Sequence, residues 1–322
     1  MHLLIHSAAA SAPAMVQGET QEETSRPQGG LPMALGAYLI WGTMPLYLRL
    51  VHWVPPFEFI GWRIIWTLPL CLGVVVWRGQ GQALLGALRR PRNVALLALS
   101  ALLIAVNWMV YVIAIQSGHV FAASLGYYIN PLVNVLAGTL LLGERLTRRQ
   151  WLAVGLAALG VSLLAWDARE MLWISLTLAI SFSAYGLVRK LVAVESLPGL
   201  TIETLVLLIP AALTAWWFAQ GPDGSAMTRS PGAAGLLMAG GAITGVPLLL
   251  FAAAARRMDY SSLGMVQFCA PTIVFFLGVF VFGEPLRAVQ LACFVLIWSA
   301  IAVFVWDIVS LRRARLLREA PA

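Results

Sequence analysis

Long apolar segments separated by short polar connections make up nearly the whole chain. We predict ten helices from these segments, with the ranges 31–51, 58–77, 94–116, 119–142, 148–166, 171–191, 200–219, 233–255, 260–282 and 286–308. About 20 apolar residues are enough for a helix to cross a hydrocarbon core about 30 Å thick. The segments must be helical, because lipid cannot satisfy the hydrogen bonds of loose backbone groups. The pattern therefore predicts an all-α integral membrane protein with ten transmembrane helices.

Composition also favours a lipid environment. The 322 residues are 60% hydrophobic and only 11% charged, whereas a soluble domain carries about 25% charged residues. A net charge of +7 would suit a nucleic-acid partner, but the basic residues are dispersed among short connections and form no basic face. We therefore expect the lipid bilayer, and no nucleic acid, as the partner of this surface.

The two ends of the chain differ from the ten apolar segments. Residues 1–30 are rich in Ser, Gln, Glu and Gly, and they lack the basic start, apolar centre and cleavage site of a signal peptide. We predict a disordered cytoplasmic leader over 1–30 and a basic cytoplasmic tail over 311–322. The first helix would then act as the insertion signal.

The distribution of Lys and Arg predicts the orientation of the helices. If the N-terminus is cytoplasmic, sixteen basic residues fall on the cytoplasmic side and four on the outer side. Lys and Arg are enriched in the cytoplasmic connections of membrane proteins. We therefore expect ten spans with both termini in the cytoplasm.

The two halves of the chain resemble one another at a shift of 140 residues. The phrase "GERLTRRQ" (143–150) returns as "GEPLRAVQ" (283–290), and identical residues pair at Pro131/Pro271, Gly138/Gly278, Gly143/Gly283, Glu144/Glu284, Leu146/Leu286, Gln150/Gln290, Leu156/Leu296, Trp166/Trp306 and Asp167/Asp307. Chance similarity between helix ends is the alternative explanation. On the repeat interpretation each unit has five spans, so the second unit enters the membrane inverted. We therefore predict an inverted repeat of two five-helix units, 31–167 and 168–310, an architecture that secondary transporters use for alternating access.

The repeated Gly-Glu pair has a local explanation as well. Thr147 followed by Gln150 fits a capping box at the start of the fifth helix. We therefore interpret Glu144 and Glu284 as helix-end residues rather than substrate ligands.

One predicted helix carries a close-packing motif. Gly241 and Gly245 give a GxxxG-type surface on the eighth helix. This surface would pack either within the protein or between the protomers of a homodimer.

Several stretches of the sequence together resemble a known family. They are "AYLIWGTMPLY" (37–47), "WRIIWTLP" (62–69), "NWMVYVIAIQSGHV" (107–120), "SLGYYINPLVNVLAGTLLLGERL" (124–146), "YGLVRK" (185–190), "ETLVLLIP" (203–210) and "QFCAPTIVFFLGVFVFGE" (267–284). The combination resembles the EamA-type transporters of the drug/metabolite transporter superfamily, and more narrowly the RarD group of chloramphenicol-sensitive or chloramphenicol-resistance permeases. The resemblance covers about 31–310 and implies a ten-helix permease of the bacterial inner membrane, without fixing its substrate.

Two charged residues stand out within the predicted spans. A charge near the bilayer centre costs about 2.5–3.5 kcal/mol. Arg63 lies near the start of the second helix, and Glu203, its counterpart at the shift of 140, lies early in the seventh. Arg63 either snorkels to the interface or binds an anionic or carbonyl-bearing substrate group in a central cavity. Glu203 likewise either reaches the interface or faces a central cavity. In a cavity it would bind a substrate cation or a coupling proton. A direct Arg63–Glu203 pair, structural or functional, is a further hypothesis.

Polar and aromatic residues within the spans complete the candidate substrate site. Tyr127, Asn130 and Asn134 share one helix face at spacings of three and four. The remaining candidates are Trp41, Asn107, Tyr111, Tyr185 and Gln267. Each amide could instead form an interhelical hydrogen bond, and each aromatic ring could simply pack. Together they would suit a flat, amphipathic organic molecule.

Motifs of competing function classes are missing from the sequence. It contains no GxxxxGK[ST], HExxH or GxSxG motif, and its cysteines and histidines lack metal-ligand spacing. We therefore assign no catalytic residue, cofactor or metal. The sequence predicts a secondary transporter that moves small organic metabolites or drugs, as an exporter with proton coupling through Glu203 as a hypothesis. A passive channel or facilitator, and an intramembrane enzyme, are the alternatives.

Overall fold

The computed structural model describes residues 29–117, 119–167, 171–283 and 285–319. The predicted leader over 1–30 lies almost entirely outside the described residues, as does Glu284. The helices are α1 (Gly30–Leu50), α2 (Pro56–Trp77), α3 (Gly81–Leu88), α4 (Pro91–Gln116), α5 (Val120–Leu141), α6 (Arg148–Asp167), α7 (Leu172–Leu191), α8 (Ser196–Ala219), the 3-10 turn η2 (Ala226–Thr228), α9 (Pro231–Ala255), α10 (Tyr260–Gln267), α11 (Cys269–Phe280) and α12 (Ala288–Glu319).

Most of these helices are suited to a bilayer. Nine segments of the described chain are long and apolar enough to cross a membrane: α1, α2, α4, α6, α7, α8, α9, the α10–α11 pair and α12. The helix α5 is not among the nine, although its 22 residues match a span in length. Several helices and their exposed apolar side chains make this a multi-pass membrane protein, and the tenth span stays a prediction.

Local sequence signals explain several helix starts. The helices α2, α4 and α9 each have a proline at their first position, where its missing amide costs nothing. Ser230 caps α9, because its hydroxyl accepts the Ala233 amide at 3.1 Å. The predicted capping box before α6 is confirmed, since Thr147 and Gln150 exchange side-chain to backbone hydrogen bonds of 3.0 and 3.1 Å.

The repeated Gly-Glu pair lies at a left-handed turn in both halves. Gly143 and Gly283 have φ values of +67° and +68°, a conformation that glycine adopts without steric cost. Glu144 accepts the amides of Tyr260 at 2.7 Å and Ser261 at 2.8 Å. The interpretation of Glu144 as a helix-end residue is therefore confirmed, and the end that it caps belongs to α10 in the other half of the chain.

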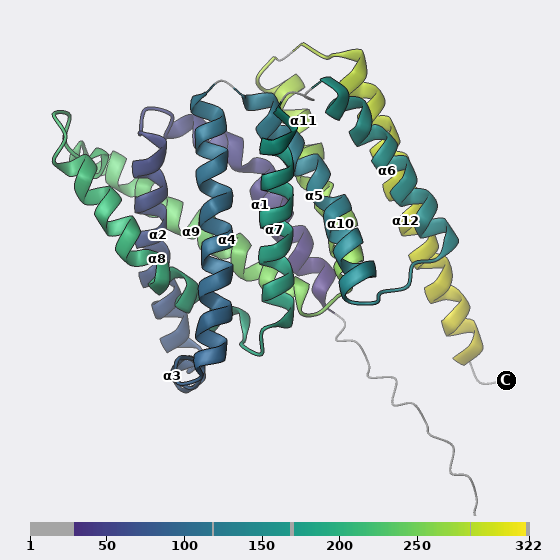
Figure 1. The fold of residues 1–322 in the computed structure, drawn as a ribbon, viewed down its shortest axis with the longest axis horizontal. Coiled ribbons are helices and arrows are strands. Elements are labelled where there is room, and N and C mark those ends of the chain that lie inside the picture. The colour runs from purple at the N-terminus through teal and green to yellow at the C-terminus, as the bar shows by residue number, and fades with distance from the viewer. Residues whose placement is uncertain (1–28, 118, 168–170, 284, 320–322) are drawn as a thin grey trace, which may run out of the picture.

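The packing of the helices relates the two halves of the chain. The helix α2 packs against α8, α5 against α10, and α6 against α12. The helix α1 packs against α9 and α11, while α7 packs against α4 and α5. Figure 1 places α2 and α8 at one edge of the bundle and α6 and α12 at the other, with the α5–α6 and α11–α12 connections at opposite ends of the helices.

The small residues of α9 allow it to lie close to α2. A Cβ atom at Gly241 would come within 2.5–2.7 Å of the Trp66 backbone, and one at Gly245 would lie 3.1 Å from the Thr67 methyl group. The Thr67 hydroxyl also donates to the Gly241 carbonyl at 3.0 Å. The expected close-packing surface is confirmed as a contact within the protein.

Two predicted segments differ from the structure. The single helix predicted over 260–282 is interrupted at Phe268, between α10 and α11. Pro271 has no amide to donate to the carbonyl of Gln267 four residues earlier, which explains a break there. The expected tail over 311–322 is not separate, since α12 continues to Glu319.

Candidate substrate site

Arg63 is an unpaired cation inside the helix bundle. It lies two turns into α2, and its Nε atom is buried without a hydrogen-bond partner. The guanidinium carbon lies 4.3 Å from the Trp108 ring centroid and 5.7 Å from that of Phe59. No carboxylate of the described residues forms an ion pair with it. The stacked rings stabilise the charge, and the terminal nitrogens have no hydrogen-bond acceptor among the described residues.

Three tyrosines complete the surroundings of Arg63. Tyr47, Tyr111 and Tyr127 all lie within electrostatic reach of the guanidinium. The Tyr47 hydroxyl already has a protein partner, because it donates to a backbone carbonyl of α9 at 2.7 Å. The rings of Tyr111 and Tyr127 meet edge to face with centroids 5.9 Å apart. We call Phe59, Arg63, Trp108, Tyr111 and Tyr127 the arginine–aromatic site.

Tyr127 joins this site from a second helix. Its side chain comes from α5, yet it reaches the environment of Arg63 on α2, so it faces the interior of the bundle. It is nevertheless 40% exposed. The Tyr127 hydroxyl and an unpaired guanidinium, which come from different helices, can together bind a carboxylate, nitro or carbonyl oxygen, while the rings stack on a flat group.

Glu203 forms an ion pair with Arg189 and not with Arg63. Its carboxylate lies 3.4 Å from Nη1 of Arg189 and accepts the hydroxyl of Ser100. The hypothesis of a direct Arg63–Glu203 pair is therefore wrong for this structure. Arg189 lies in the last turn of α7, and the short connection to α8 folds back and brings Glu203 beside it.

The Arg189–Glu203 pair is fully enclosed by protein. The Arg189 side chain is 0% exposed and that of Glu203 is 3% exposed. Arg189 Nη2 donates to the Ser196 carbonyl at 2.9 Å. Tyr185, another expected site residue, lies one turn before Arg189 and within electrostatic reach of both charges.

The candidate amides form hydrogen bonds between helices. Asn107 donates to the Leu178 carbonyl at 2.8 Å. Asn130 donates to a carbonyl of α7 at 2.6 Å and accepts from Gln267. Asn134 donates to Gln267 at 2.8 Å, and its own carbonyl oxygen has no partner. These side chains join α4, α5, α7 and α10 in the described conformation.

Trp41 belongs to a separate aromatic cluster. Its ring lies 5.5 Å from Phe182 and 5.7 Å from Phe251, and Tyr185 stacks on Phe251 at 6.0 Å. The structure thus divides the ten expected residues. It brings together Arg63, Tyr111 and Tyr127, then Glu203 and Tyr185, then Asn130, Asn134 and Gln267. Trp41 is connected to the second group through Phe182 and Phe251, and Asn107 lies outside all three groups.

Sequence reasoning missed Trp108, Ser100 and Arg189. Arg189 was one of the sixteen basic residues assigned to the cytoplasmic connections, although its position four residues after Tyr185 places both on one helix face. Trp108 has no periodic signal that separates it from the other tryptophans. Among the described residues, no group of three or more His, Cys, Asp or Glu side chains is placed to hold a metal ion.

Comparison with known proteins places the chain in a family. Residues 28–166 match the EamA-like transporter family. The chain is 44% identical over 288 residues to "Uncharacterized transporter PA0485" of Pseudomonas aeruginosa, covering 88% of this chain and 95% of that protein. It is 42% identical to "Protein RarD" of Escherichia coli, covering 88% and 96%, and 30% identical to "Chloramphenicol-sensitive protein RarD" of Pseudomonas aeruginosa, covering 90% and 96%.

One solved structure is similar in fold. It is "Crystal structure of protein", with a TM-score of 0.67 and 22% identity over 87% of this chain and 98% of that chain. Likeness at this identity concerns the fold alone. The relatives, the family match and the apolar helices together lead to one conclusion: the chain belongs to the EamA-like transporter family, in its RarD group, and is a multi-pass membrane transporter.

Proposed function

We propose that the protein is a secondary transporter that exports small organic metabolites or drugs across the bacterial inner membrane by alternating access. The observation that carries this proposal is the arginine–aromatic site, an unpaired cation framed by rings inside a bundle of apolar helices. The excess of Lys and Arg in one set of connections supports cytoplasmic termini.

Alternating access requires two units that move against each other, and we propose the inverted repeat of 31–167 and 168–310. The exchanged packing partners of α1 and α7 support it, as does the location of the α5–α6 and α11–α12 turns at opposite ends of the bundle. The matching left-handed turns at Gly143 and Gly283 are further support. Five spans in each unit would invert the second.

We propose that a substrate binds with an anionic, nitro or carbonyl group on Arg63 and a flat group between Trp108 and Tyr111. A charge-assisted hydrogen bond contributes about 1.5–3 kcal/mol, so the loss of Arg63 would weaken binding by about tenfold to a hundredfold. The printed name of one relative suggests chloramphenicol as a first probe. This molecule has a nitroaromatic ring and an amide, which suits both parts of the site.

The first test measures the flux of labelled chloramphenicol into inverted membrane vesicles. The second compares the metabolites inside and outside cells that have or lack the protein. We expect Arg63→Ala to lose at least tenfold in flux and Arg63→Lys to lose less. The control is Arg49→Ala, which removes an exposed arginine at the end of α1. Normal flux and binding in Arg63→Ala, for every solute that the wild type moves, would contradict the assigned site.

We also propose that Glu203 carries the coupling proton. Its carboxyl is buried between Arg189 and Ser100, so binding a proton would break the ion pair and release Arg189. We expect Glu203→Gln to abolish the dependence of flux on a pH gradient. Unchanged pH-gradient dependence with normal flux would remove Glu203 from the mechanism.

The same vesicles distinguish the rival functions. A proton-coupled transporter accumulates its substrate against a gradient, whereas a passive facilitator only equilibrates it. Recovery of the solute chemically unchanged separates both from an intramembrane enzyme.

A further inference from the structure

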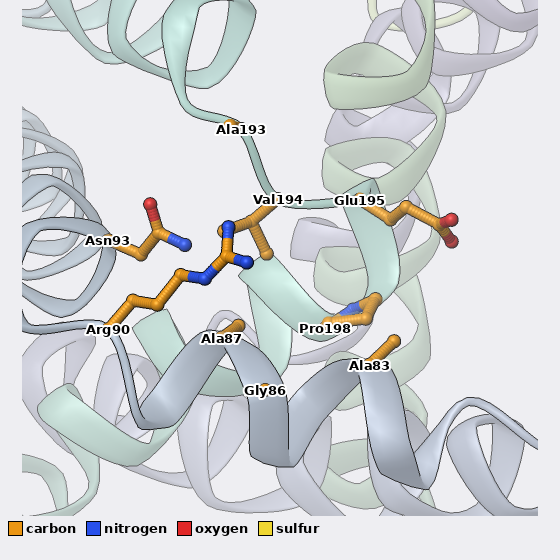
Figure 2. Close-up of a pocket in the computed structure, with 9 residues that line it drawn as sticks. All are labelled: Ala83, Gly86, Ala87, Arg90, Asn93, Ala193, Val194, Glu195 and Pro198. Atoms are coloured by element: carbon orange, nitrogen blue, oxygen red, sulfur yellow. The ribbon is translucent and has the colours of Figure 1, made fainter.

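A pocket of about 230 Å³ opens away from the arginine–aromatic site, between α3, the start of α4 and the α7–α8 connection. Figure 2 shows how its lining residues lie. Most of them are small or apolar: Ala83, Gly86, Ala87, Ala193, Val194 and Pro198. The polar side chains that remain are Arg90, Asn93 and Glu195.

The charge inside this pocket is positive. The Arg90 guanidinium lies over Ala87 beside Val194, while Glu195 points away from it (Figure 2). The Glu195 carboxylate accepts a hydrogen bond from the Gln80 side-chain amide at 2.8 Å. Arg90 has no ion pair or side-chain hydrogen bond within the described part of the chain. The pocket therefore presents a cation that forms no ion pair with its one carboxylate, Glu195, which points away from it.

The surrounding sequence strengthens the positive potential. Arg78, Arg89 and Arg92 flank Arg90, and the sequence has no Asp or Glu between Glu58 and Glu144. Charges of one sign with no compensating partner raise the local concentration of anions.

The pocket lies where lipid headgroups would be. The helix α3 connects α2 and α4 at one end of the bundle (Figure 1). Beside the pocket, Leu85 is 55% exposed, Leu88 is 40% exposed and Trp77 is 81% exposed. A short helix with exposed apolar side chains and adjacent arginines is typical of the membrane interface. The positive charges favour the cytoplasmic leaflet, whose lipids are anionic.

The other half of the chain supplies an internal comparison. A second pocket of about 340 Å³ contains Trp53, Glu58, Asp223 and Ala226, which correspond to Ala193, Pro198, Ala83 and Gly86 at the shift of 140 residues. The arginine of this second pocket, Arg229, stacks over Trp53, with its guanidinium carbon 5.0 Å from the ring centroid. It also contains two carboxylates, whereas the first pocket contains one that points away from its arginine, so the unpaired cation is particular to the first pocket.

We propose that the first pocket binds the phosphate group of an anionic phospholipid of the cytoplasmic leaflet. The planar guanidinium of Arg90 would donate two hydrogen bonds to the phosphate oxygens, and the Asn93 amide would donate another. A bound headgroup would link α3 and α4 of one half to the α7–α8 connection of the other. A free phosphate ester offers the same oxygens, so the experiment must distinguish the two sources.

The test is native mass spectrometry of the delipidated full-length protein in detergent, with phosphatidylglycerol or phosphatidylcholine added. We expect the wild type to retain phosphatidylglycerol selectively and Arg90→Ala to lose about tenfold or more in retention. Gly86→Leu should have the same effect, because Gly86 lines the pocket, a Cβ atom there meets no atom within 4 Å, and the larger side chain would take up pocket volume. The matched control is Arg92→Ala, which removes one charge outside the pocket and should retain the lipid.

Four outcomes would overturn the proposal: retention in Arg90→Ala and Gly86→Leu equal to that of the wild type, an equal loss in Arg92→Ala, equal retention of phosphatidylcholine, or glycerol 3-phosphate binding as tightly as the lipid. Arg90 and Gly86 are both exposed, and thermal unfolding of the variants checks that they remain folded. Because lipid retention does not depend on transport, failure here leaves the proposed function intact.

Discussion

Replacing Arg189 by methionine removes the counter-charge of a buried carboxylate while keeping a side chain of similar length. The two charges are 3.4 Å apart, and at an effective dielectric constant of about 20 they attract by about 5 kcal/mol. The desolvation of both groups offsets part of this attraction in the native protein. Removal of one partner leaves the other charge buried and alone, which costs about 3–5 kcal/mol. We expect Arg189→Met to destabilise the protein by that amount.

A double-mutant cycle measures the pair itself. The free energy of unfolding would be followed by tryptophan fluorescence in mixed micelles for Arg189→Met, Glu203→Gln and the double variant. Glu203→Gln should cost less than Arg189→Met, because the glutamine oxygen can still accept the Ser100 hydroxyl. The double variant should be more stable than the sum of the single effects predicts, with a coupling of about 2–3 kcal/mol.

The control for this cycle is Arg78→Met, an exposed arginine just beyond α2, which should change stability by less than about 0.5 kcal/mol. Strict additivity of the two single variants would refute the claim that the ion pair contributes to stability. So would an Arg189→Met protein as stable as the wild type.

Three further predictions concern packing and turns, each measured by the same unfolding assay. Gly241→Ala should destabilise by about 1–3 kcal/mol, because its methyl group would press on the Trp66 backbone; Gly235→Ala on the same helix meets open space and should be neutral or stabilising, and equal effects would contradict the close contact. Glu144→Ala leaves two amides of α10 without their acceptor and should cost about 1–2 kcal/mol; no loss would mean that water replaces the carboxylate. Gly143→Ala should cost about 1 kcal/mol, because φ there is +67°; a neutral result would indicate a different turn.

Much of the architecture follows from local sequence. Most predicted segments begin and end within a few residues of the observed helices, because the apolar residues of a bilayer span are consecutive in the sequence. The short helix α3 and the extension of α12 to Glu319 were not predicted. The capping box at Thr147 and Gln150 depends on residues three apart and was predictable for the same reason. The break at Phe268 was missed, although Pro271 carries a local signal for it.

The candidate site was only partly predictable. The sequence singled out Arg63 and Glu203, because a charge within an apolar span is conspicuous. It could not assign their partners, which come from other helices: Trp108 on α4 for Arg63, and Arg189 on α7 for Glu203. The sequence analysis assigned Arg189 to a connection between helices, but its side chain is fully buried in the structure.

The sequence by itself determined a membrane protein built from apolar helices, most of the helix boundaries, and the two charges, Arg63 and Glu203, that stand out within them. Only the tertiary structure decided which charge is paired and which is open, because pairing depends on how helices far apart in the chain pack together. It also decided that Gly241 faces α2, that Glu144 caps a helix of the other half, and that Arg90 lies in a pocket whose one carboxylate, Glu195, points away from it. Periodicity along one helix gives the face on which a residue lies, but not the neighbour that this face meets.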